Sequence, residues 1–118
     1  MRILLTLAAS AALCGCGISA DIYVEADNHP EPLKGMATAT CLTGTFYAED
    51  NGKLYCNGAY NSRDGSPSLE VNFQCSDGRS GKATVNRYGD YLQHGTGQGQ
   101  LSDGTAIKVY MGDEAKQK

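Results

Sequence analysis

The sequence predicts an all-β protein, a small antiparallel meander of about six or seven strands that curls into a barrel or a sandwich. Apolar and polar residues alternate in several segments, most clearly in the run SLEVNFQC at 68–75. Asn-Gly and Asp-Gly pairs, which accept the positive φ of tight hairpin turns, separate these segments. No stretch has the spacing of an amphipathic helix. With 118 residues and a net charge of −3, the chain suits one small domain and lacks the basic face that nucleic acid requires.

Residues 1–15 are predicted to be a signal peptide. Arg2 supplies a positive charge, and the run from Ile3 to Leu13 is apolar or small except for Thr6 and Ser10. This run is too short to cross a bilayer as a permanent helix, which needs roughly 20 apolar residues. The chain is therefore expected to be exported.

The end of this signal, Leu13-Cys14-Gly15-Cys16, resembles the lipobox of bacterial lipoproteins. The resemblance implies that Cys16 carries a diacylglycerol thioether, becomes the new N-terminus and is then N-acylated. Two or three acyl chains make such an attachment effectively permanent. Gly17 follows, where Asp would favour the inner membrane, so the resemblance implies a lipid anchor in the outer membrane, facing the periplasm. The alternative is an ordinary secretory signal cut after Ala20, which discards both cysteines.

Residues 16–35 are predicted to be the lipidated cysteine and a flexible acidic tether. From Gly17 to Gly35 the chain holds four acidic residues and two prolines, and proline disfavours both a helix and a central strand. The short apolar island at 22–24 is compatible with an added edge strand. The all-β domain is expected over 36–112, followed by a polar tail at 113–118.

Export makes disulfides permissible, and lipidation at Cys16 leaves three cysteines in the body: Cys41, Cys56 and Cys75. The preferred pair is Cys56–Cys75, which closes a loop of roughly 20 residues and stabilises the fold by about 3 kcal/mol on the chain-entropy account. Cys75 also continues the apolar row of the 68–75 strand. Cys41–Cys56 is the alternative pair. With the preferred pair formed, Cys41 is expected to be a buried thiol.

The recurring glycine and Asp-Gly rhythm is loosely similar to that of MORN-type repeats, which are stacked hairpins. A closer resemblance, over residues 44–112, is to short exported bacterial proteins of unknown function. The motifs that carry it are Cys56-Asn57-Gly58-Ala59-Tyr60, the segment Cys75 to Gly81, and the glycine run from Gly95 to Leu101. This resemblance implies the Cys56–Cys75 disulfide and no particular activity.

No catalytic residue, metal site or cofactor is expected. The glycine run at 95–101 is followed by another turn, whereas a phosphate loop opens a helix. His94 has Asp90 nearby but no convergent nucleophile, and zinc is disfavoured because no histidine lies near a cysteine in sequence. Asp64, Asp77 and Asp103 each precede glycine and are interpreted as turn residues rather than calcium ligands.

The tyrosines are the candidate binding residues, because clustered tyrosines on a wet sheet face make a rigid binding surface. The sequence does not show whether they cluster: they are Tyr47, Tyr55, Tyr60, Tyr88, Tyr91 and Tyr110. The expected function is that of a non-catalytic envelope lipoprotein, bound to the membrane by its lipid. It is expected to bind or scaffold another envelope component, a protein partner, through a sheet face. The alternative is a small inhibitor or immunity-type protein that blocks an exported enzyme with the turn at 77–81.

Overall fold

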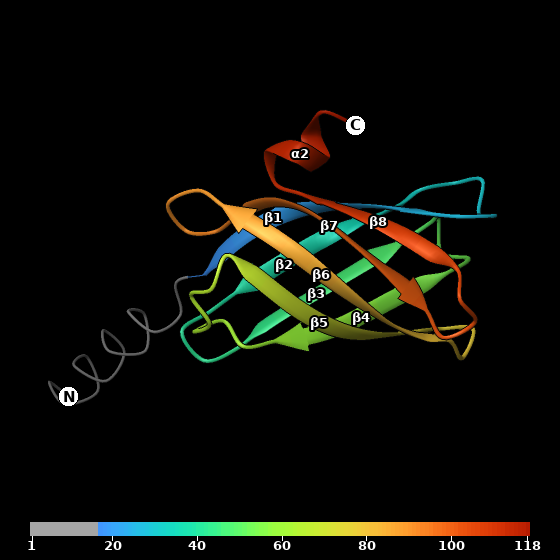
Figure 1. Ribbon diagram of the computed structural model, residues 1–118, viewed down its shortest axis with the longest axis horizontal. Coiled ribbons are helices and arrows are strands. Elements are labelled where there is room, and N and C mark those ends of the chain that lie inside the picture. Colours follow the sequence, from blue (N-terminus) through green and yellow to red (C-terminus); the bar gives the residue numbers. More distant parts are fainter. Residues whose placement is uncertain (1–16) are drawn as a thin grey trace, which may run out of the picture.

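The computed structural model describes residues 17–118, and these form an eight-stranded antiparallel meander that closes into a barrel (Figure 1). The all-β prediction is confirmed. The barrel is the observed form rather than the sandwich, with eight strands rather than six or seven. The predicted signal peptide and the lipidated Cys16 lie outside the described residues.

Each strand pairs with the next one in the chain, and β1 pairs with β8 to close the barrel. A short helix, α2, follows the last strand (Figure 1). The bounds are β1 Ile18–Ala26, β2 Leu33–Ala39, β3 Gly44–Glu49, β4 Tyr55–Tyr60, β5 Ser68–Cys75, β6 Ser80–Tyr88, β7 His94–Leu101, β8 Ala106–Met111 and α2 Asp113–Lys116. Over residues 17–118, no helix is long and apolar enough to cross a membrane.

The predicted flexible tether is wrong for the residues that the structure describes. Residues 18–26 form β1, and β2 begins at Leu33, so the domain starts well before residue 36. The chain alternates here, with Ile22 and Val24 facing the interior between polar neighbours. The prolines do not interrupt either strand, because both lie in the turn between β1 and β2. This segment therefore completes the barrel wall.

The predicted polar tail is also partly wrong, because α2 contacts β1, β7 and β8. Ala115 is buried in this contact. The backbone N–H of Asp113 donates a hydrogen bond of 2.9 Å to Nδ1 of His94. At the chain end, Lys118 Nζ lies 4.3 Å from the ring centre of Tyr110. The C-terminal segment thus packs along the outside of the barrel.

Inward-facing glycines let the strands curve tightly around a narrow interior. The ring of Tyr60 lies over Gly44, where any side chain on Gly44 would collide with it. A Cβ on Gly99 would collide with the backbone carbonyl of Lys82 on β6. The glycine run at 95–101 leaves one face of β7 without side chains, and the backbone of β6 lies close against that face.

The two ends of the barrel differ. At the turn end, which carries the connections 27–32, 50–54, 76–79 and 102–105, four aliphatic side chains close the interior. These are Leu33, Leu54, Leu101 and Ile107, each less than a tenth exposed. The loop end carries the connections 40–43, 61–67 and 89–93, and the first strand begins there. The apolar core is therefore densest toward the turn end.

Candidate functional site

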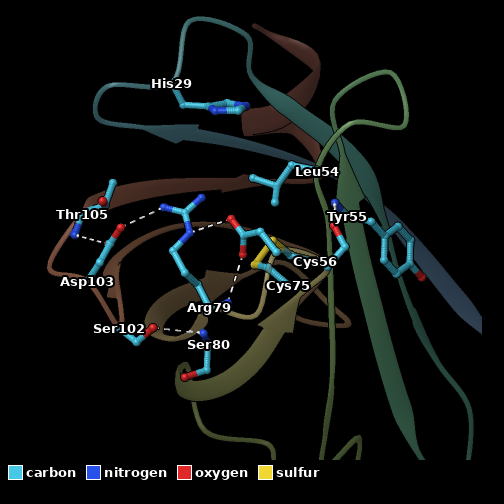
Figure 2. Close-up of polar contacts among 12 residues, drawn as sticks. His29, Leu54, Tyr55, Cys56, Cys75, Arg79, Ser80, Ser102, Asp103 and Thr105 are labelled. Carbon is cyan, nitrogen blue, oxygen red and sulfur yellow. Dashed lines mark hydrogen bonds and ion pairs between the residues drawn. A yellow bond between two sulfur atoms is a disulfide. The ribbon is translucent and has the colours of Figure 1, made fainter.

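The disulfide joins Cys56 and Cys75, as preferred from the sequence. The two residues are direct partners on β4 and β5. The buried position expected for Cys41 is wrong: Cys41 is exposed in the loop between β2 and β3. Its carbonyl accepts a hydrogen bond of 3.4 Å from Nε of Arg63. The disulfide lies near the turn end, beside the polar network described below (Figure 2).

Two of the candidate tyrosines, Tyr47 and Tyr55, stack on the outer face of the sheet. Their ring centres are 6.0 Å apart and their planes differ by 17°. The side chain of Met36 shares this face, because Met36 is the direct partner of Tyr47 across β2 and β3. The exposed fraction is 38% for Met36, 38% for Tyr47 and 40% for Tyr55. We call Met36, Tyr47 and Tyr55 the tyrosine patch.

Strand alternation and register together position the tyrosine patch. Residues 46 and 48 face the core, so Tyr47 between them must face outward. Tyr55 is the partner of Glu49, two positions further along β3, which makes Tyr47 and Tyr55 diagonal neighbours. Diagonal positions on neighbouring strands are within reach of aromatic side chains. Met36 was not singled out from the sequence, because the strand that carries it was not identified there.

The other candidate tyrosines do not join this patch. Tyr60 faces the interior, and Tyr91 is exposed in the connection between β6 and β7. Tyr88 lies against the ring of His94 and donates a hydrogen bond of 2.6 Å to Glu114. Tyr110 packs edge-on against Tyr23 on the outside of β1 and β8. The candidate tyrosines thus do not form one large cluster. The tyrosine patch holds two of them, Tyr47 and Tyr55, beside Met36.

Arg79 joins two turns at the turn end (Figure 2). Its Nε lies 2.7 Å from Oδ2 of Asp77, and its Nη1 lies 3.1 Å from Oδ2 of Asp103. Hydrogen bonds from Thr105, with the nearby guanidinium of Arg79, lower the pKa of Asp103 to about 2. All three side chains are partly exposed to solvent, so the pairs contribute modestly to stability. Their main effect is to fix the shape of the two turns.

A second polar contact at this end joins His29 and Asp50. The His29 Nε2 atom lies 2.5 Å from Oδ2 of Asp50, whose side chain is only 3% exposed. The backbone N–H of Leu54 donates a 2.6 Å hydrogen bond to the other carboxylate oxygen. These hydrogen bonds hold the pKa of Asp50 below its usual value, the bond from Leu54 contributing most. Asp50 therefore anchors the turns at 27–32 and 50–54 to each other.

The remaining candidates from the sequence have structural partners. Asp64, Asp77 and Asp103 each accept a hydrogen bond from the backbone N–H two residues ahead, as turn residues do. His94 holds the start of α2 through its Nδ1 atom. Within residues 17–118, no three His, Cys, Asp or Glu side chains converge in a way that could hold a metal ion.

One polar side chain that the sequence did not single out faces the interior. Arg87 continues the inward row of Gly81, Ala83 and Val85 on β6, and it lines the interior cavity. Its Nη2 atom donates hydrogen bonds to the carbonyls of Asp64 and Ser66, at 2.9 and 2.5 Å. The strict alternation of inward and outward residues along β6 could have indicated from the sequence that Arg87 faces inward.

Comparison with known proteins adds no relative: no family model, no curated protein and no solved structure matches the chain. The assignment of a site therefore depends on geometry. Two features of the described residues are suited to binding, namely the tyrosine patch outside and the apolar cavity inside.

Proposed function

We propose that the protein is a non-catalytic lipoprotein of the bacterial cell envelope, anchored through Cys16, that binds another envelope component through the tyrosine patch. The observation that carries this proposal is the stacked pair of Tyr47 and Tyr55, exposed beside Met36 on a rigid sheet. Tyrosines offer large apolar area with a hydroxyl and lose little entropy on binding. Methionine adapts its shape to a partner.

The charges around the patch favour a protein partner. Lys34 and Glu49 are direct strand partners next to the patch, and Asn57 lies opposite Tyr47 on β4. An apolar centre with a polar rim is the usual anatomy of a protein interface. The adjacent charges are of both signs, which suits a protein surface better than a uniformly charged polymer. We therefore expect an envelope protein as the partner.

The alternative of an enzyme inhibitor would use the turn at 77–81. In this turn, Arg79 is already engaged by Asp77 and Asp103, so its guanidinium is partly neutralised. The turn is well ordered by these bonds but offers no exposed apolar anchor of the kind that dominates tight interfaces. The patch on β2, β3 and β4 is the better supported surface.

The test is photo-crosslinking in intact cells, with a photoreactive amino acid placed at position 47, at position 79 or at position 84. Thr84 is exposed on β6, so it serves as the control position. We expect a crosslinked envelope protein from position 47 alone, recovered with the membrane or wall fraction. A crosslink to a soluble exported enzyme from position 79 would overturn the proposal in favour of the inhibitor.

A matched variant completes this test. The Tyr47→Ala, Tyr55→Ala double variant should fail to capture the partner in a pull-down of the lipidated protein. Because both side chains lie on the outer face, their loss should leave the melting transition of the barrel in place. Retention of the partner by this folded variant would contradict the patch as the binding surface.

A further inference from the structure

The interior of the barrel is apolar and incompletely filled. A cavity of about 100 Å³ lies inside the wall. Inward-facing side chains such as Phe46, Val71 and Val109 are only partly buried. Across residues 17–118, no large side chain is buried to less than 2% exposure. Protein interiors are normally packed to crystal-like density. The interior of this barrel is packed less densely, so it has room for a small ligand.

The lining of this cavity is apolar except for Tyr60 and Arg87. Tyr60 ends β4 and Arg87 stands next to the end of β6, so both lie toward the loop end. The opposite end is closed by the four aliphatic side chains named above. The cavity therefore has an apolar interior and a polar mouth, and Arg87 is the one charged side chain among the described residues that line the cavity.

Arg87 is incompletely satisfied by the protein. Its Nη2 atom bonds two loop carbonyls, but its buried Nε has no hydrogen-bond acceptor among the described residues. No carboxylate of residues 17–118 lies within 4.0 Å of it. Asp64 interacts electrostatically with Arg87, but its Oδ1 accepts a hydrogen bond from the backbone N–H of Ser66. A buried charged donor without an acceptor is costly, and an anion would relieve that cost.

Tyr60 supplies a second polar group at this mouth. Burial raises the pKa of its hydroxyl, and the positive charge of Arg87 opposes that rise. The hydroxyl therefore stays protonated at neutral pH and can donate a hydrogen bond. Tyr60 and Arg87 therefore interact electrostatically, and both line the same cavity.

We propose that the barrel binds a short-chain carboxylate, with the alkyl chain inside the cavity and the carboxylate on Arg87 and Tyr60. An apolar protein cavity of about 150 Å³ binds the six carbons of benzene, so the smaller cavity here suits about four carbons. A six-carbon carboxylate would place its last four carbons inside and its carboxyl end at the mouth. A guanidinium pairs with a carboxylate by strong, charge-assisted hydrogen bonds. This site is separate from the tyrosine patch, because it lies inside the wall rather than on it.

The experiment titrates hexanoate, hexanol and hexylamine into the full chain carrying Cys16→Ala, so that no acyl chain on the protein competes. Binding is followed by calorimetry and by NMR shifts of the cavity methyl groups. We expect hexanoate to bind at least about tenfold more tightly than hexanol, because hydrogen bonds to a charged group have this strength. Hexylamine, which is cationic at neutral pH, should bind more weakly than either.

Variants of one strand separate the site from general charge effects. Arg87→Met should abolish the preference for hexanoate over hexanol, while Arg87→Lys should keep part of it. Lys82→Met is the matched control, since Lys82 is exposed on the outer face of the same strand. This control should bind hexanoate like the parent. Retained binding of hexanol by Arg87→Met shows that the variant is folded and its cavity is intact.

Two results would overturn the proposal. One is the absence of saturable hexanoate binding to the parent chain. The other is an equal preference for hexanoate in the parent and in a folded Arg87→Met variant, because the carboxylate would then lie elsewhere. Neither result bears on the tyrosine patch, which the crosslinking experiment tests by itself.

Discussion

Cys56 and Cys75 lie directly opposite each other on β4 and β5, with their Cα atoms 4.0 Å apart. The disulfide closes a loop with a sequence separation of 19 residues. It therefore fastens the hairpin of β4 and β5 at the turn end of the barrel.

Removal of this disulfide should lower the stability of the barrel. The Cys56→Ala, Cys75→Ala double variant is expected to lose about 3 kcal/mol of unfolding free energy, because a loop of this length restricts the unfolded chain. Urea denaturation measures the change, and the reduced parent should behave like the double variant. Alkylation of all the body thiols without reductant, detected by mass spectrometry, would contradict the disulfide.

The close approach of β7 and β6 should make Gly99 intolerant of a side chain. Gly99→Ala is expected to lower the unfolding free energy by about 2 kcal/mol, because its Cβ collides with the Lys82 carbonyl. Gly65→Ala is the control, since no atom lies within 4 Å of the added group. Its effect should stay within about 0.5 kcal/mol. Equal effects of the two substitutions would contradict the packing described for β7.

Asp103 should contribute to acid sensitivity. Its pKa in the folded protein is about 2, below the value of 3.8 expected without these contacts. A lowered folded pKa stabilises the protein above the unfolded pKa, and this contribution is lost as the pH falls from 3.8 toward 2. Asp103→Asn should therefore be less stable than the parent at neutral pH, and the difference should shrink over this acid range. Denaturation at several pH values measures it, and parallel curves would refute the assignment.

The proposed lipid anchor gives a direct expectation for Cys16. Cys16→Ala should move the protein from the membrane fraction to the soluble fraction, because the acyl chains supply the membrane affinity. Metabolic labelling with a fatty acid should mark the parent and not the variant. Identical partitioning of the two proteins, with no label in either, would remove the basis for an envelope anchor.

The regular strands were predictable because alternation and turn residues agree there. The strand at 68–75 and the glycine run at 95–101 have the inward and outward faces that their sequences indicate. Of the strand at 18–26, only the island at 22–24 was allowed as an edge strand, because Asp21 and Glu25 raise the charge of the segment, although both occupy outward positions. In this segment the acidic composition was misleading, and the alternation of apolar and polar residues correctly indicated a strand.

The candidate sites were harder to predict, because they depend on register. Tyr47 and Tyr55 become neighbours only when β3 and β4 pair in the observed register, and Met36 joins them through β2. Arg87 follows three small or apolar inward residues on its strand, and an arginine in that row is ordinarily expected at the surface. Only closure of the barrel shows that it borders a cavity.

The early start of β1 has a mechanical consequence. The wall begins at Ile18, two residues after Cys16, and two extended residues span at most about 7 Å. A lipid at position 16 would therefore be joined to the barrel without a long linker. The barrel would lie on the lipid headgroups with its loop end toward the membrane, and it would diffuse laterally. Any partner would therefore have to lie within one domain's height of that leaflet.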